Sequence, residues 1–262
     1  MIKKSAAVGA YTMKEKGPSE REGHRMQELS KEELMERVQL HRLSGSAEKR
    51  LDLQDIVLRD MDLSGADLKQ IDFSRSSFYH VRLDRANLSG SVLNNTWFEG
   101  CTLRGADLKK ADLTSSALRG ADMRDCDIRG ANLFCAVLEK TNLEGCIADE
   151  DTRFFRLYCP ESGAFIGYKK CCDDRIVELL IPADAKRTSA TRNSCRCSKA
   201  KVLVIKSFDC SEYFQEAWSI VDENFVYRTG EWVKVPDFDE DRWNDSTTGI
   251  HFWMTREDAI RY

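Results

Sequence analysis

A large apolar side chain returns at every fifth position between residues 53 and 143, and this period limits the possible folds more than any other feature of the chain. In the stretch RGADLKKADLTSSALRGADM it falls at Leu108, Leu113, Leu118 and Met123. An α-helix repeats about every 3.6 residues and a β-strand every two, so neither element produces it. The full series is Leu53, Leu58, Leu63, Leu68, Phe73, Phe78, Leu83, Leu88, Leu93, Phe98, Leu103, Leu108, Leu113, Leu118, Met123, Ile128, Leu133, Leu138 and Leu143.

A small or β-branched residue stands two positions before most of these central residues. Examples of this second series are Ala66, Val81, Ala86, Cys101, Ala106, Ala111, Ala121, Cys126, Ala131 and Thr141. Two inward positions in every five residues indicate a coil with short sides. Because one such unit buries too little apolar surface alone, the units must stack on one another, which is typical of a solenoid.

The units GADLK, RANLS, KADLT, GADMR and GANLF resemble the A(D/N)LXX motif of pentapeptide repeat proteins. The resemblance implies a right-handed quadrilateral β-helix with four repeats per coil, whose large and small residues both point inward. The central residues would then form about five coils, and at about 4.8 Å per coil the rod would be roughly 24 Å long. We therefore predict a mainly β protein with an N-terminal capping helix and a C-terminal α+β domain.

The pattern divides the chain into four predicted parts. Residues 1–29 are polar and lack periodicity, which is typical of a mobile tail. Residues 30–50 contain a helix and cap, residues 51–147 contain the repeats, and residues 148–262 form a different domain. No stretch has the apolar length of a signal peptide or membrane span, so we expect a cytoplasmic protein.

The predicted N-terminal helix carries a recognisable start signal. Ser30 suits the N-cap and Glu33 follows three residues later, as in a capping box. Leu29 and Leu34 flank this cap as a hydrophobic staple, and Gly45 marks the predicted end of the helix. This helix is expected to cover the open end of the first coil.

The C-terminal part abandons the five-residue period. Short apolar runs at 163–168, 176–181, 201–205, 224–228, 231–235 and 249–253 predict strands in a mostly antiparallel sheet. TREDAIRY predicts a last helix with Thr255 as its N-cap. The phrases CPESGAFIGYKKC and GIHFWMTREDAIRY resemble an uncharacterised domain that follows pentapeptide repeats in proteins of bacteria and their phages, a domain without an established activity.

One face of the predicted coil is apolar. Residues twenty apart should stack, which places Val57, Trp97 and Val137 in one column. Tyr79, Val92 and Phe134 lie on or beside this face. An apolar stripe of this breadth needs a cover, which is either another part of the chain, a second copy in a homodimer, or a foreign protein.

Two groups of basic residues raise the question of an anionic ligand. The outward residues Arg104, Lys109, Arg119, Arg124 and Arg129 sit among many acids, so mixed surface charge competes with polyanion binding. The second group is Arg187, Arg192, Arg196 and Lys199 in and beside the polar loop 188–199. This loop either faces an acidic partner or pairs with the acidic loop 237–245.

The chain as a whole lacks the charge of a general nucleic-acid binder. It has 40 Lys+Arg against 44 Asp+Glu and a net charge of −4, so direct binding of nucleic acid is not expected. Some pentapeptide repeat proteins resemble B-form DNA and bind DNA gyrase, and an acidic repeat rod leaves a DNA-mimicking inhibitor as an alternative. The predicted rod is short for that role.

An enzyme is a further alternative, located in the C-terminal domain. Arg228, His251 and Tyr262 loosely resemble the arrangement of ADP-ribosyltransferases, although no glutamate stands in the place of their catalytic acid. A histidine flanked by Ile, Phe and Trp is otherwise typical of a satisfied core position. We predict no catalytic residue, and retain these three as the alternative set.

Metal and cofactor binding are not predicted. The chain has ten cysteines, which for a cytoplasmic protein favours reduced, structural thiols. Cys171 and Cys172 are adjacent and Cys195 and Cys197 are separated by one residue, whereas structural zinc sites favour C-x2–4-C pairs.

The end of the repeats also needs a cover, and the apolar residues that follow predict one. Phe154, Phe155, Leu157 and Tyr158 come directly after the last repeat and are expected to pack on it, joining the two folded parts rigidly. The function that we favour from the sequence is a non-enzymatic interaction scaffold or adaptor for a protein partner, phage-encoded or host-modulating, whose repeats provide a docking surface.

Overall fold

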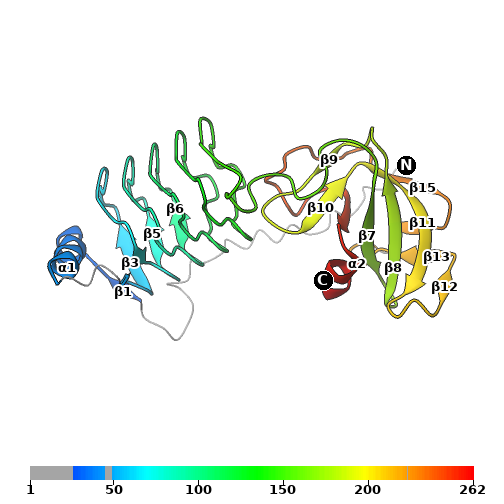
Figure 1. The fold of residues 1–262 in the computed structure, drawn as a ribbon, viewed down its shortest axis with the longest axis horizontal. Coiled ribbons are helices and arrows are strands. Elements are labelled where there is room, and N and C mark those ends of the chain that lie inside the picture. The colour runs from blue at the N-terminus through cyan, green and yellow to red at the C-terminus, as the bar shows by residue number, and fades with distance from the viewer. Residues whose placement is uncertain (1–25, 45–48, 223) are drawn as a thin grey trace, which may run out of the picture.

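The computed structural model describes residues 26–44, 49–222 and 224–262. The protein is mainly β and elongated, with helix α1 (Lys31–Leu43) at one end, a row of stacked coils in the middle and a large antiparallel sheet at the other end (Figure 1). The tail predicted for residues 1–25 and the helix end predicted at Gly45 lie outside the described residues.

The coils contain short strands that pair in parallel. These are β2 (Leu51–Asp52), β3 (Ile56–Arg59), β4 (Ile71–Asp72), β5 (Ser77–Tyr79) and β6 (Trp97–Glu99). A preceding strand, β1 (Gln27–Glu28), pairs with β3 in parallel. Residues 27 and 28 are therefore part of the fold, and the prediction that the mobile tail reaches residue 29 is wrong at this point because backbone pairing holds them.

Backbone pairing recurs at intervals of twenty residues, which is four pentapeptides per coil. Asp62 pairs with Arg82, Arg82 pairs with Thr102, and Thr102 pairs with Asp122. The ladder continues as far as a bridge between Asn132 and Arg153. Residues twenty apart therefore stack, as the sequence predicts.

The period of five has a backbone cause. From Asp55 to Gly145, every fifth residue has a positive φ, between 47° and 71°. This left-handed conformation turns the chain at each corner, and glycine adopts it without steric cost. Non-glycine residues such as Asn95 occupy many of the corners, so stacking on the neighbouring coils must compensate for their backbone strain.

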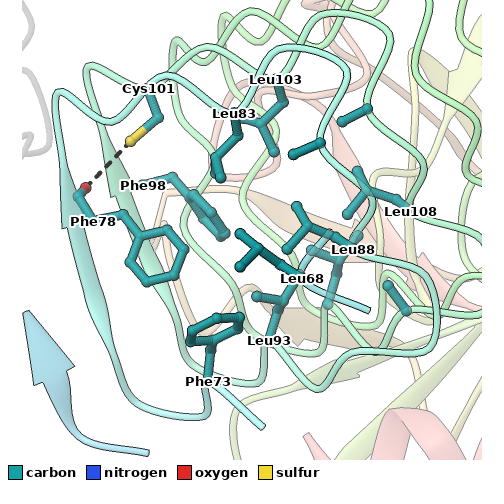
Figure 2. Close-up of a cluster of buried hydrophobic side chains, with 14 of the residues drawn as sticks. Leu68, Phe73, Phe78, Leu83, Leu88, Leu93, Phe98, Cys101, Leu103 and Leu108 are labelled. Carbon is teal, nitrogen blue, oxygen red and sulfur yellow. Dashed lines mark hydrogen bonds between the residues drawn. The ribbon is translucent and has the colours of Figure 1, made fainter. Parts of the chain in front are cut away.

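The central residues fill the inside of the coils. Figure 2 shows Leu68, Leu88 and Leu108 inside the coil, together with Phe73 and Phe78, and all five are fully buried. The small residues complete this core and also satisfy backbone groups: the Cys101 thiol donates to the carbonyl of Phe78 at 3.4 Å (Figure 2).

Helix α1 begins as the sequence predicts. The Ser30 hydroxyl accepts from the Glu33 amide and the Glu33 carboxylate accepts from the Ser30 amide, which completes the capping box. Leu34 and Val38 are buried in the same apolar cluster as the first central residues. Leu43, at the end of the helix, is in contrast 75% exposed, so the apolar contact of α1 with the coils comes from its earlier turns.

The C-terminal domain is built around an eight-stranded antiparallel sheet with the order β12-β11-β8-β7-β16-β10-β9, in which β15 also pairs with β11. The bounds are β7 (Phe165–Cys171), β8 (Arg175–Ile181), β9 (Arg187–Thr188), β10 (Ser194–Cys197), β11 (Lys199–Ser207), β12 (Tyr213–Phe214), β15 (Trp232–Lys234) and β16 (Ile250–Trp253). A separate hairpin consists of β13 (Glu216–Trp218) and β14 (Val226–Arg228).

The chain ends with helix α2 (Arg256–Arg261), whose N-cap Thr255 accepts from the Asp258 amide as predicted. The predicted apolar runs correspond to β7, β8, β11, β14, β15 and β16. The sequence did not indicate β9, β10, β12 and β13, because these strands are short or polar and their conformation depends on pairing with a neighbouring strand or, for β10, also with the distant β16.

The repeats and the C-terminal domain are in direct contact. The rings of Phe134 and Phe154 lie 4.8 Å apart, and those of Phe155 and Trp243 lie 5.7 Å apart. Phe154, Phe155 and Trp243 all pack against the apolar core of the coils. Tyr158 is 41% exposed and is not among the residues packed there, so the predicted cover involves Phe154 and Phe155 and receives Trp243 from far along the chain.

Candidate functional site

The apolar stripe on the coils is partly covered at its N-terminal end. Val57 is 4% exposed and Tyr79 is 8% exposed, and the Arg59 guanidinium lies 4.0 Å from the centre of the Tyr79 ring. These two residues are therefore not free to form the predicted docking surface. Strand β1 extends the sheet beside Val57, whose partner on β1 is Glu28, and the Arg59 side chain covers the Tyr79 ring.

The remainder of the stripe keeps part of its surface in solvent. Trp97, Ala117 and Val137 stack through successive backbone bridges, as predicted, and each is half-buried. Val92 is half-buried on the neighbouring column. Phe134 is 37% exposed, with its ring against Phe154.

The five basic residues on the coils are all paired with acids. Arg104 and Arg124 contact Asp122 at 2.6 and 2.8 Å, and together they lower the pKa of its carboxyl group, with Arg124 contributing most. The same kind of pairing holds for Lys109 with Asp107, Arg119 with Glu139 and Arg129 with Asp127. Of the two interpretations of these residues, the ion pairs favour mixed surface charge over a site for a polyanion.

Arg187 is held by the backbone and does not face a partner. Its guanidinium donates to the carbonyls of Gly163 and Pro182, each at 2.7 Å, and to that of Ala183 at 2.9 Å. It also lies 5.1 Å from the centre of the Phe165 ring. Its inclusion in the predicted binding set is wrong, because its guanidinium is already hydrogen-bonded to carbonyl groups of the neighbouring loops.

Arg196 is also structural. The residue is 2% exposed, and its guanidinium donates to the carbonyls of Asp239 and Thr248 at 3.0 and 2.7 Å and to those of Asp241 and Asn244, each at 3.0 Å. Burial lowers the pKa of this group. Its inclusion in the binding set is wrong because the acidic loop wraps around it.

The other two basic residues are paired at the surface. Arg192 lies 3.6 Å from Asp245 and Lys199 lies 2.6 Å from Asp184. Part of the predicted basic loop is in fact strand β10, in which Cys195 and Cys197 face the domain core while Arg196 faces the acidic loop. Of the two alternatives, the structure supports pairing of the basic and acidic loops.

The alternative catalytic residues lie in different settings. Arg228, on the hairpin, contacts Glu216 at 2.8 Å. His251, on β16, contacts the Asp245 carbonyl at 3.3 Å, and burial lowers its pKa. Tyr262 stacks on Trp253 with 4.6 Å between ring centres. No contact among the described residues joins these three side chains.

Lys169 was considered from the sequence only as a basic neighbour of the loop 188–199, but it is a buried ionisable group of the domain. It lies on the inward side of β7, is 6% exposed, and its ammonium stands 5.9 Å from the centre of the buried Tyr227 ring. Burial lowers its pKa. The alternation Gly167, Lys169, Cys171 along β7 is a signal that could have revealed it, since both neighbours point into the core.

The ten cysteines are free thiols. The Cys195 thiol hydrogen-bonds that of Cys159 and lowers its pKa, and both residues are buried in the domain core. In the described part of the chain, no group of three or more His, Cys, Asp or Glu residues is arranged to hold a metal ion. No described helix is both long and apolar enough to cross a membrane.

Comparison with protein families assigns the two halves separately. Residues 52–90, 86–125 and 116–147 match pentapeptide repeats, and residues 155–259 match a family of unknown function, DUF5758. No curated protein matches the chain significantly.

Several solved structures are similar to it. A pentapeptide repeat protein from the Arabidopsis thaliana thylakoid lumen is 32% identical with a TM-score of 0.33, and the match covers 34% of this chain and 64% of that protein. HetL, a pentapeptide repeat protein involved in heterocyst differentiation regulation in the cyanobacterium Nostoc, is 28% identical with a TM-score of 0.33, and the match covers 49% of this chain and 56% of HetL. The match thus spans less than two thirds of either protein. The chain joins a segment of pentapeptide repeats to a C-terminal domain of a family whose function is unknown.

Proposed function

We propose that this protein is a non-enzymatic interaction scaffold for a protein partner. In this proposal, residues 51–147 form a right-handed quadrilateral β-helix of about five coils, α1 in the region 30–50 caps its first coil, and residues 148–262 form the recognition module. The scaffold would act in the cytoplasm, as a phage-encoded or host-modulating protein.

The observation that carries the proposal is the half-buried apolar column Trp97, Ala117 and Val137 on a rigid stack. These side chains retain solvent contact on coils that are held in place by backbone pairing with their neighbours. Apolar surface presented in this way is typical of sites of protein association.

The rigidity rests on the contacts between the two folded parts. Besides the packed aromatic rings, the Cys135 amide donates to the Thr191 carbonyl at 2.9 Å, and the Thr191 hydroxyl donates to the Ala136 carbonyl at 2.7 Å. A partner could therefore contact both parts at once without an entropic cost for ordering a linker.

The test is affinity capture with the full chain and two matched variants. One variant carries Trp97→Glu and Val137→Glu, and the control carries Thr102→Glu and Asn142→Glu, which lie one pentapeptide later on the same two coils. We expect at least one protein to be retained by the wild type and the control and lost from the stripe variant, as detected by mass spectrometry. Equal retention by all three would contradict a docking role for this column, and sedimentation of the free chain would reveal whether a second copy covers it.

A further inference from the structure

The sheet of the C-terminal domain has an outer face turned away from its main buried cluster. Helix α2 covers this face at Ile176 and Trp253, whereas β11, β12 and β15 continue it beyond the helix. On β11, Ala200, Val202 and Ile205 point into that cluster. Lys201 and Lys206 point the other way, and the register shift between Val202 and Val204 puts them on the same side although they are five residues apart. We call this side the outer sheet face.

The neighbouring strands add residues to the outer sheet face by direct cross-strand pairing. Trp232 lies opposite Lys201, Lys234 lies opposite Lys199, and Tyr213 lies opposite Lys206. Directly paired residues of antiparallel strands point to the same face, so two aromatic rings and four lysines share this surface.

The charge of the outer sheet face is positive and largely uncompensated. Lys199 is paired with Asp184 at 2.6 Å, but Lys201, Lys206 and Lys234 form no ion pair with any acid of the described residues. The Lys206 ammonium instead lies 5.4 Å from the centre of the Tyr213 ring. On β8, Glu178 supplies an acidic group at an outward position.

The two aromatic rings are available to a ligand. Trp232 is 50% exposed and Tyr213 is 68% exposed. Their partners on β11 are five residues apart, which corresponds to roughly 16 Å along the strand. Two rings at this separation, each with a lysine directly opposite it, can stack two bases that are a few nucleotides apart while the ammonium groups contact the phosphates.

We propose that the outer sheet face binds single-stranded nucleic acid. The proposal goes beyond protein docking on the coils and rests on the proposed function only in treating the C-terminal domain as the recognition module. The net charge of −4 does not oppose it, because it describes the whole chain, whereas these lysines are gathered on one surface and acids of the coils such as Asp122 and Asp127 are paired with arginines there. An acidic protein segment would satisfy the lysines but would leave two exposed rings without a role.

The experiment measures the fluorescence anisotropy of a fluorescein-labelled dT20 oligonucleotide titrated with the full chain at several salt concentrations. We expect Trp232→Ala to weaken binding about 5- to 150-fold, the range for loss of one stacked base. The double variant Lys201→Gln and Lys206→Gln should lower the slope of log K against log[salt] by about 1.4, or about 0.7 per lost phosphate contact.

The matched control carries Lys110→Gln and Lys140→Gln, two exposed lysines on the coils, and should bind the oligonucleotide like the wild type. Three results would each overturn the proposal. They are an equal loss of affinity for dT20 in this control, an unchanged affinity in Trp232→Ala, and binding of a polyglutamate peptide in place of dT20. The Trp97→Glu and Val137→Glu variant leaves the outer sheet face intact. Its oligonucleotide binding therefore separates failure of this inference from failure of the docking function.

Discussion

Two buried cationic side chains of this protein, Arg196 and Lys169, differ in how well the surrounding protein solvates their charge. Arg196 places its planar guanidinium among four carbonyl oxygens, so the charge is solvated by the backbone. Lys169 has no such arrangement, since within the described chain its ammonium faces the Tyr227 ring and forms no ion pair. An ammonium buried in this way favours its neutral form and makes the folded state sensitive to pH.

Lys169→Met should therefore stabilise the protein and reduce its dependence on pH. The folded pKa of Lys169 lies below its unfolded value of about 10.4, so between these two values the unfolded chain binds more protons. The free energy of unfolding of the wild type then rises with pH across this window. The variant should lack this contribution and be more stable at neutral pH by about 1–3 kcal/mol, the range seen when buried charges are replaced by apolar groups.

Urea unfolding at pH 7 and pH 9.5 measures both effects, with Lys140→Met, at an exposed lysine, as the control for charge removal. A steep alkaline rise in stability that survives Lys169→Met would show that another group causes it.

At the scale of the elements, the strands of the coils are short, and contacts between buried side chains inside the stack stabilise the coils. Phe78 lies between Phe73 and Phe98 in edge-to-face contacts, with ring centres 5.4 and 5.1 Å apart, and all three rings are buried. Each coil thus depends on its neighbours for most of its contacts, as in other solenoids. Damage inside one coil should propagate along the stack.

Phe78→Ala should destabilise the coils by about 3–5 kcal/mol, because it removes a fully buried ring from a column that cannot collapse around the cavity. Val92→Ala, at a half-buried outward position, is the matched control and should cost less than about 1 kcal/mol. Chemical unfolding followed by circular dichroism compares the two, and similar losses for both would mean that the column does not carry the stability.

At the scale of the whole molecule, the end of the coils is covered by residues from two distant segments. Phe155 follows the last repeat, whereas Trp243 belongs to the acidic loop near the end of the chain, and their rings stack. Arg242, beside Trp243, donates to the Ser189 carbonyl at 3.0 Å and ties this loop to the rest of the domain. The coils and the C-terminal domain should therefore behave as one cooperative body.

A double-mutant cycle on Phe155→Ala and Trp243→Ala tests this coupling. We expect an interaction energy of about 0.5–1.5 kcal/mol between the two rings, and a single thermal transition in the wild type that separates into two in the double variant. Additive effects of the two substitutions, or two transitions already in the wild type, would show that the parts unfold independently.

Local signals in the sequence were sufficient for much of this architecture. The spacing of the central residues predicted the stacking of residues twenty apart, and Ser30 with Glu33 and Thr255 with Asp258 predicted where the two helices begin. These features depend on neighbours in the chain or on a strict repeat, so the pattern of residues is enough to determine them.

The candidate sites depended on contacts between residues far apart in the sequence. A basic, polar loop was predicted where β10 lies, because nothing local shows that Arg196 would be enclosed by carbonyls more than forty residues away. Likewise, strand pairing decides whether Val57 is covered, whether Lys169 is buried and whether Trp232 shares a face with Lys201. The sequence by itself determined the repeat and the first residues of the two helices. Only tertiary packing decided which charges are satisfied internally and which remain available to a partner, because solvation of a side chain depends on everything that surrounds it in space.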